Sequence, residues 1–189
     1  MSIIYSMLKE LRQKSSEVVL ENPYWQYRLD RYELGDGSEA AYHYAHTPGS
    51  VMVIPITDSD AFVMVRQYRY LNRRESIEFP GGGVKSGLGI EASAHSELRE
   101  ETGSDCRLLT PIGSFNPMNG LTDELCSVFV ATGLKPSAAS PDKTEEFIVE
   151  ELSYQECLTL IANGKLWDGM TLAALAIFAE RRSEFFQNK

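Results

Sequence analysis

The N-terminal half of the chain alternates hydrophobic and polar residues, or gathers hydrophobic residues in short runs, as β-strands do. Strands are predicted at residues 24–32, 40–45, 51–56, 61–69 and 76–80. Gly35-Asp-Gly-Ser between the first two strands favours a hairpin, and Gly81-Gly-Gly after the last requires a sharp turn. The residues before these strands, to about Val19, are predicted to form a short helix.

A helical period replaces the alternation between Ile90 and Thr102. Ile90, Ala94 and Leu98 recur every four residues and share one face, and Gly103 is a typical helix stop. Further strands are predicted at residues 108–115, 126–131 and 147–152, and helices at 154–163 and 170–186. This order of elements predicts an α+β fold, an α/β/α sandwich, and not a parallel βαβ array.

Composition narrows the class of protein. The 27 Asp+Glu against 18 Lys+Arg give a net charge of -9, which disfavours nucleic-acid binding because that requires a basic surface. Cys106, Cys126 and Cys157 are too scattered for a disulfide framework or a zinc site. No apolar run approaches the roughly 20 residues of a membrane span, and the N-terminus lacks a signal-peptide pattern. We expect a cytoplasmic protein without a membrane partner.

Three glutamates gather on the predicted helix. Glu97 and Glu101 are four residues apart and Glu100 is three residues from Glu97, so the carboxylates share a face that we expect opposite the apolar stripe. Like charges so close destabilise a helix by roughly a few tenths of a kcal/mol per pair. A bound divalent cation would offset that repulsion. A solvated acidic surface is the alternative that the residues alone leave open.

The surroundings of this helix carry a known motif. The helix follows Phe79-Pro-Gly-Gly-Gly and ends in Ser96-Glu-Leu-Arg-Glu-Glu-Thr-Gly. This segment resembles the Nudix box, G-x5-E-x7-R-E-U-x-E-E-x-G-U, in which U is bulky and apolar. The matching residues are Gly82, Glu97, Leu98, Glu100, Glu101 and Gly103. The resemblance implies a Nudix fold with a mixed sheet and an N-terminal antiparallel strand extension.

Three positions depart from the box. Leu88 replaces its first Glu, Ser96 replaces its Arg and Ser104 replaces an apolar residue. The resemblance implies that this Glu and Arg would pair and brace the helix, and here both charges are absent together. Losing both partners of an ion pair can be close to neutral, whereas losing one is costly. A working site with altered bracing is therefore favoured over a non-catalytic relic.

Further segments resemble the ADP-ribose and nucleoside-diphosphate-sugar pyrophosphatase branch of the family. They are Val65-Arg-Gln-Tyr-Arg, Ile77-Glu-Phe-Pro-Gly-Gly, Trp167-Asp-Gly-Met-Thr-Leu-Ala-Ala-Leu and the N-terminal hairpin. ADP-ribose hydrolases often have Ser-Pro-Gly where this chain has Met118-Asn-Gly. The resemblance divides the chain into a helix and hairpin extension, residues 1–48, and a Nudix domain, residues 49–189. Such an extension commonly forms a homodimer.

The resemblance also assigns roles in a metal site. Glu97, Glu101 and the Gly81 carbonyl are expected ligands of Mg²⁺, with Mn²⁺ as the alternative ion, and Glu100 is a ligand or lies beside one. Carboxylate oxygens suit such hard cations. Glu100 is also expected to act in catalysis, and the general base is expected in the acidic loop after the box, at Glu145 or Glu146. A solvated charge run is the alternative for that loop.

Substrate contacts are expected around the metal, and the candidates are Arg69, Arg66, Glu78, Trp25, Tyr42 and Asn119. The arginines would hold a phosphate through paired N–H donors, with a surface pair at a strand edge as the alternative. The glutamate would contact metal-bound water or a ribose hydroxyl. The two aromatic residues would stack on a base, with core positions as the alternative. The asparagine lies in the loop that departs from the ADP-ribose hydrolases.

These expectations combine into one function. The sequence predicts a Mg²⁺-dependent pyrophosphohydrolase that cleaves the diphosphate of ADP-ribose, or of a related nucleoside diphosphate sugar, to a nucleoside monophosphate and a sugar phosphate. Leu88 and Ser96 favour the alternative, a weak or inactive Nudix domain that binds a nucleotide sugar as a sensor. A nucleoside-triphosphate hydrolase is a third interpretation, which the long hairpin disfavours. Leu166 follows Gly164-Lys165, so this segment is not a P-loop.

Overall fold

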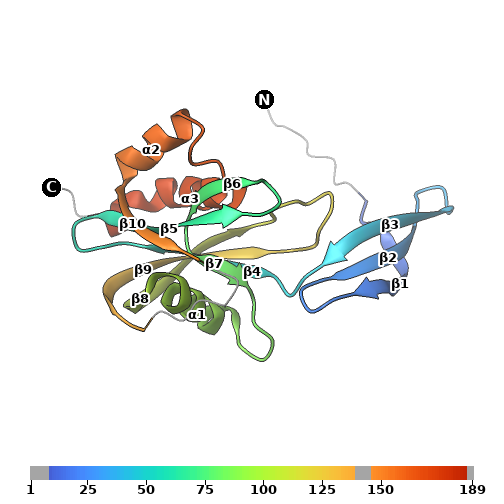
Figure 1. Ribbon diagram of the computed structural model, residues 1–189. Helices are drawn as coiled ribbons and strands as arrows, with labels where there is room; N and C mark the ends of the chain where they lie inside the picture. Colours follow the sequence, from blue (N-terminus) through green and yellow to red (C-terminus); the bar gives the residue numbers. More distant parts are fainter. Residues whose placement is uncertain (1–8, 139–145, 187–189) are drawn as a thin grey trace. The chain divides into compact units, whose positions relative to one another are not determined.

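The computed structural model describes residues 9–138 and 146–186 (Figure 1). Proximity of Cα atoms divides the chain into two compact units. The smaller unit contains the chain up to Thr47 and the segment Met118–Asp123, and the larger unit contains Pro48–Pro117 and Glu124–Lys189. The predicted glutamate helix therefore belongs to the larger unit.

The smaller unit is an antiparallel sheet in the order β1-β2-β3. Its strands are β1 (Arg12–Glu21), β2 (Gln26–Glu33) and β3 (Glu39–His46). The predicted hairpin around Gly35-Asp-Gly-Ser is confirmed as the β2–β3 pair. The helix expected up to Val19 is wrong for the described residues, since residues 12–19 lie in β1. Their backbone groups pair with β2 along its other edge, and β-branched Val18 and Val19 suit a strand.

Two sheets form the larger unit, in the strand orders β10-β5-β6 and β7-β4-β9-β8. Their strands are β4 (Ser50–Pro55), β5 (Ala61–Arg69), β6 (Arg74–Glu78), β7 (Gly81–Gly83), β8 (Ser104–Phe115), β9 (Cys126–Pro136) and β10 (Ile148–Ser153). Strands β4 and β9 pair in parallel and the other neighbours pair antiparallel. The predicted mixed sheet is therefore confirmed.

Helices cover both sides of these sheets. They are α1 (Ile90–Thr102), α2 (Tyr154–Ala162) and α3 (Gly169–Phe185), and Figure 1 shows α1 on one side and α2 and α3 on the other. In β4, Val51 and Val53 are buried with residues of α1, whereas Met52 and Ile54 are buried with residues of α2 and α3. A strand that is apolar on both faces requires a layer on each side. The predicted α/β/α sandwich of the α+β class is confirmed.

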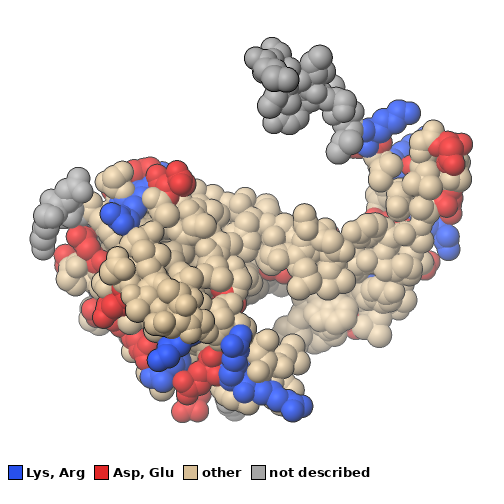
Figure 2. All heavy atoms as spheres, turned by 90° about the horizontal axis from the view of Figure 1, so that it is seen from above, with Lys and Arg blue, Asp and Glu red and all other residues tan. Residues whose placement is uncertain are grey.

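The surface carries charges of both signs. On the face shown in Figure 2, acidic and basic side chains of the described residues lie in mixed groups, and the whole chain has a net charge of -9. Among the helices of the described residues, none combines the length and the apolar character needed to cross a membrane.

Candidate active site

Strand β7 consists of glycines, so its backbone packs directly against helix α1 without side chains between them. The strand consists of Gly81, Gly82 and Gly83 and pairs with β4. A Cβ atom on Gly82 would lie 2.9 Å from the Glu97 carboxylate carbon, and one on Gly81 would lie 2.4 Å from the Val51 carbonyl oxygen. Gly81 therefore requires glycine, because a Cβ there would meet backbone, whereas a Cβ on Gly82 would force the Glu97 side chain to shift. A Cβ on Gly83 would meet no atom within 4 Å.

Helix α1 buries two of its three candidate glutamates. Glu97 and Glu101 are each 8% exposed, and the Gly81 N–H donates to Glu101 Oε2 at 3.2 Å. Both share the buried face of α1 with Ala94, so the expectation that the carboxylates lie opposite the apolar stripe is wrong. Residues three and seven positions after Ala94 lie on its own face of a helix. Ile90, a residue of the predicted apolar stripe, is 47% exposed.

Lys85, in the loop between β7 and α1, contacts two of the α1 glutamates, Glu97 and Glu100. Its Nζ lies 3.3 Å from Glu97 Oε1, donates to Ser96 Oγ at 3.2 Å and forms a very short ion pair with Glu100. Burial lowers the pKa of Lys85, but the Glu100 hydrogen bond and the two carboxylate charges outweigh burial and raise that pKa. The predictions gave Lys85 no role. The signal that could have found it is a cation three residues before Leu88, in a motif that lacks its arginine.

Arg69 and Glu78 form an ion pair between strands β5 and β6. Arg69 Nε donates to Glu78 Oε1 at 2.8 Å, and Nη2 makes a shorter contact with the other carboxylate oxygen. Gln67 adds a 3.4 Å hydrogen bond to Glu78, which is only 3% exposed. The Glu78 hydrogen bond raises the pKa of Arg69 against the opposing effect of burial, and the charges of Asp168 and Glu101 add to this rise. Arg69 therefore lies within the electrostatic reach of Glu101 on α1.

The start of helix α3 fixes the chain just after Glu78. Asp168 caps α3 by accepting a 2.7 Å hydrogen bond from the Thr171 N–H. The hydroxyl of the fully buried Thr171 accepts a 3.2 Å hydrogen bond from the N–H of Phe79. The motif at residues 167–175 therefore has a structural role, since it holds the corner at which β6 leads into the glycine strand.

Arg66 lies on the opposite face of β5 from Arg69, because an odd number of residues separates the two along the strand. Its guanidinium pairs with Glu150 at 2.6 Å and with Glu75 at 3.3 Å. These groups line an open cavity of about 520 Å³ together with Arg74, whose guanidinium carbon lies 3.7 Å from the centre of the Trp167 ring. The structure thus assigns Arg66 to an ion-pair network and does not bring it to the α1 glutamates.

The predicted base-contacting residues lie in the smaller unit. Trp25, Tyr42 and Asn119 are exposed, and the Tyr42 hydroxyl donates to the Gly120 carbonyl at 3.1 Å. The register of β2 and β3 separates Trp25 from Tyr42 by about five residues, or roughly 16 Å, along the sheet. One chain therefore does not hold the two rings against opposite faces of one base.

The acidic loop is described only in part. Glu145 lies outside the described residues, and Glu146 is exposed and stands just before strand β10. The antiparallel pairing of Ile148 with Arg66 directs the chain before β10 toward the Arg69 end of β5. The role of either glutamate as general base stays a prediction.

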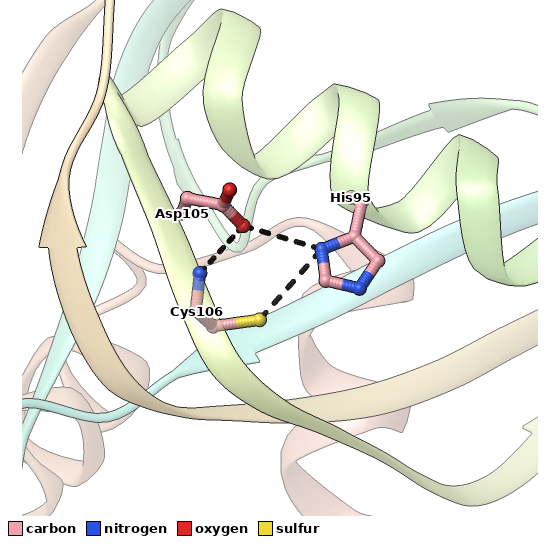
Figure 3. A group of neighbouring side chains, drawn as sticks. All are labelled: His95, Asp105 and Cys106. Atoms are coloured by element: carbon pink, nitrogen blue, oxygen red, sulfur yellow. Dashed lines mark hydrogen bonds and ion pairs between the residues drawn. The ribbon is translucent and has the colours of Figure 1, made fainter.

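A second group of polar side chains ties α1 to β8 (Figure 3). His95 Nδ1 lies 3.4 Å from Asp105 Oδ1 and 3.8 Å from Cys106 Sγ, and the Cys106 N–H donates to Asp105 Oδ1 at 2.7 Å. Burial, and after it the charge of Asp105, raises the pKa of the Cys106 thiol. Gly103, with a φ of 64°, ends α1 in the left-handed conformation just before β8 begins. These contacts hold the glutamate helix at a fixed place on the sheet.

The glutamate helix lies against the glycine strand inside an α/β/α sandwich, the fold that the motif predicted, although the burial of Glu97 and Glu101 was not predicted. Residues 46–173 match the NUDIX domain family. The chain belongs to this family, and its assignment to the Nudix hydrolases is confirmed.

Related proteins place the chain more narrowly. It is 34% identical over 150 residues to the methanol dehydrogenase activator of Bacillus methanolicus, a match that covers 78% of this chain and 81% of that protein. It is 31% identical over 149 residues to the ADP-ribose pyrophosphatase of Bacillus subtilis (strain 168), a match that covers 78% and 80%. A crystal structure of an ADP compounds hydrolase shares the fold with a TM-score of 0.81 at 20% identity, over 95% of this chain and 97% of that one. The chain is therefore similar to the ADP-ribose pyrophosphatase branch, as its motifs predicted.

Proposed function

We propose that the chain is a Mg²⁺-dependent pyrophosphohydrolase that cleaves the diphosphate of ADP-ribose or of a related nucleoside diphosphate sugar. The products would be a nucleoside monophosphate and a sugar phosphate. The observation that carries the proposal is the pair of buried carboxylates, Glu97 and Glu101, packed against the glycine backbone of β7. The relative in Bacillus subtilis, named an ADP-ribose pyrophosphatase, supports the substrate class.

The donor set suits a hard divalent cation. Glu97 and Glu101 supply carboxylate oxygens on one face of α1, and the adjacent Gly81 offers a backbone carbonyl. Oxygen ligands of this kind are those that Mg²⁺ and Mn²⁺ prefer. Burying two carboxylates together is costly unless cations balance them. When bound, the ion would neutralise phosphate oxygens and lower the pKa of a bound water.

The side chains around the metal site would orient the substrate and move protons. Arg69 would hold a phosphate oxygen, and its pair with buried Glu78 fixes the plane of the guanidinium before substrate binds. Glu100 is assigned to the ion or to its immediate surroundings. A general base takes a proton from the attacking water, and Glu146 and Glu145 are the candidates.

Base recognition is assigned to the smaller unit. Trp25, Tyr42 and Asn119 would contact the nucleoside, with the two rings contributed by different copies of the chain in a homodimer. The hydrophobic side chains Val18, Val19 and Leu20, exposed on β1, support such an assembly. We place this enzyme in the cytoplasm.

A sensor is the second candidate function. Leu88 and Ser96 remove the charged pair of the motif, which favours a domain that binds a nucleotide sugar without rapid turnover. The relative named a methanol dehydrogenase activator also favours a role exerted on another protein.

Purified protein, Mg²⁺ and a panel of nucleoside diphosphate sugars that includes ADP-ribose separate the two candidates. We expect release of a nucleoside monophosphate and a sugar phosphate from at least one compound, and its loss on addition of EDTA. Saturable binding with no product across the panel would favour the sensor. If the protein neither binds nor hydrolyses any compound of the panel, both functions are rejected.

A further inference from the structure

The loop between β7 and α1 lacks the charged pair of the motif. Leu88 stands at the Glu position and is 46% exposed, and Ser96 stands at the Arg position. The helix must nevertheless be held in place, because Glu97 and Glu101 project from it onto the glycine strand. A different contact has to connect this loop to the helix.

Lys85 makes that connection with both its backbone and its side chain. Its N–H donates at 3.1 Å to the Oγ of fully buried Ser93, in the first turn of α1. Its carbonyl accepts a 3.0 Å hydrogen bond from the Leu88 N–H, which closes the loop into a turn. Its side chain contacts Ser96 and Glu100, about one and two turns further along the helix than Ser93.

The side-chain contacts form a closed triangle. Lys85 Nζ donates to Ser96 Oγ at 3.2 Å, the Ser96 hydroxyl donates to Glu100 Oε1 at 2.8 Å, and Glu100 Oε2 accepts from Lys85. Each group is oriented by the other two, so both oxygens of Glu100 are engaged by protein donors. The same Nζ lies 3.3 Å from Glu97 Oε1. The lysine therefore sets the position of one proposed metal ligand while it is anchored on a neighbouring glutamate.

We propose that Lys85 is a positioning residue that replaces the missing arginine of the motif, with Glu100 as its anchor and not as a metal ligand. In the motif the cation is on the helix and the carboxylate is in the loop, whereas here Lys85 is in the loop and Glu100 is on the helix. The ion pair therefore still joins the loop after β7 to α1, with the two charges exchanged. Glu97 and Glu101 remain the carboxylates that face the ion. The expected effect of Lys85 on turnover rests on the proposed function, whereas its role in holding the loop against α1 does not.

The test compares four variants with the wild type. Lys85→Met removes the charge at similar length, and Lys85→Arg keeps it. Lys85→Met combined with Leu88→Glu and Ser96→Arg restores the pair of the motif in the absence of the lysine. Lys165→Met, which removes an exposed lysine at the cavity of Arg66, is the control for loss of one surface charge.

Lys85→Met should lower kcat about tenfold, the loss typical of removing a group that orients a metal ligand. KM should stay within about twofold, because Lys85 does not bind substrate. Lys85→Arg and the triple variant should recover most of kcat, and Lys165→Met should match the wild type. An unchanged kcat in Lys85→Met, or a loss that the triple variant does not recover, would overturn the proposal.

Amide hydrogen exchange gives a readout that needs no turnover. The amides at residues 84–93 should exchange several-fold faster in Lys85→Met and return to the wild-type rate in the triple variant. If the wild type hydrolyses nothing on the panel, the proposed function fails, and exchange alone then decides whether Lys85 braces the helix. Equal exchange rates in the wild type and Lys85→Met would show that Lys85 does not hold the loop against α1.

Discussion

Two regions of the larger unit concentrate charge, and they balance it differently. At the cavity lined by Arg66, the guanidinium pairs with Glu75 and Glu150, and Arg74 and Lys165 also line the cavity, so the carboxylates do not outnumber the cations. Around α1, Lys85 contacts both Glu97 and Glu100, and Arg69 pairs with Glu78. The four carboxylates of Glu78, Glu97, Glu100 and Glu101 thus outnumber these cations, and three of the four are buried. Matched charges describe a structural ion-pair network, whereas a buried excess of carboxylate describes a place for a cation.

The difference also separates two arginines of one strand. Arg69 and Arg66 both belong to the motif Val65-Arg-Gln-Tyr-Arg, but alternation along β5 sends them to opposite faces. After the Glu78 hydrogen bond, the charge of Glu101 is among the causes that raise the pKa of Arg69, whereas contacts with Glu75 and Glu150 raise the pKa of Arg66. The comparison therefore predicts large effects on activity for changes at the α1 face and small ones at the Arg66 cavity.

The largest effect is expected for Glu101→Gln. The change keeps size and hydrogen bonding but removes a charge from the proposed metal site, so kcat should fall about 1,000-fold or more. Glu75→Gln, the same chemical change in the Arg66 network, should stay within about twofold of the wild type. Steady-state hydrolysis and circular dichroism check both variants, and a fully active Glu101→Gln would refute the metal assignment.

A smaller loss is expected for Gly82→Ala. The added Cβ would lie 2.9 Å from the Glu97 carboxylate carbon, so that side chain must shift and kcat should fall about 100-fold. Gly83→Ala is the matched control, because its Cβ would meet nothing within 4 Å. Equal activity of the two variants would show that the position of the Glu97 carboxylate does not matter.

The smallest of the three effects is expected for Arg69→Ala. Loss of charged hydrogen bonds to phosphate corresponds to about 2 kcal/mol, or roughly 30-fold in kcat/KM. Arg66→Ala should leave kcat/KM within about twofold. Measuring both variants on one substrate tests the comparison directly, and a reversed order would place the phosphate on the other face of β5.

The sequence predicted what depends on local chemistry. The bounds of α1 agree with the prediction because Gly103 ends the helix in a left-handed conformation. Strand β1 was missed because its pairing with β2, and not its own pattern, defines it. The predicted face of α1 is wrong, since Glu97 and Glu101 are buried with Ala94, and their spacing of three and seven residues from Ala94 places them on its face of the helix.

The contacts of Lys85 could not be predicted from spacing. They depend on how the loop after β7 folds back onto α1, where the lysine meets Ser93, Ser96 and Glu100. Arg66 is different, since the two-residue period of a strand already places it away from Arg69. Loop conformation depends on contacts between distant segments, whereas strand alternation can be predicted from the sequence alone.

Binding of Mn²⁺ to the protein without substrate tests the central claim most directly. Electron paramagnetic resonance titration of the wild type and of Glu101→Gln measures the affinity of the α1 face for a divalent cation. We predict saturable binding to the wild type and an affinity at least about tenfold weaker in Glu101→Gln. Equal affinity in the two proteins, or no binding to the wild type, would contradict the account.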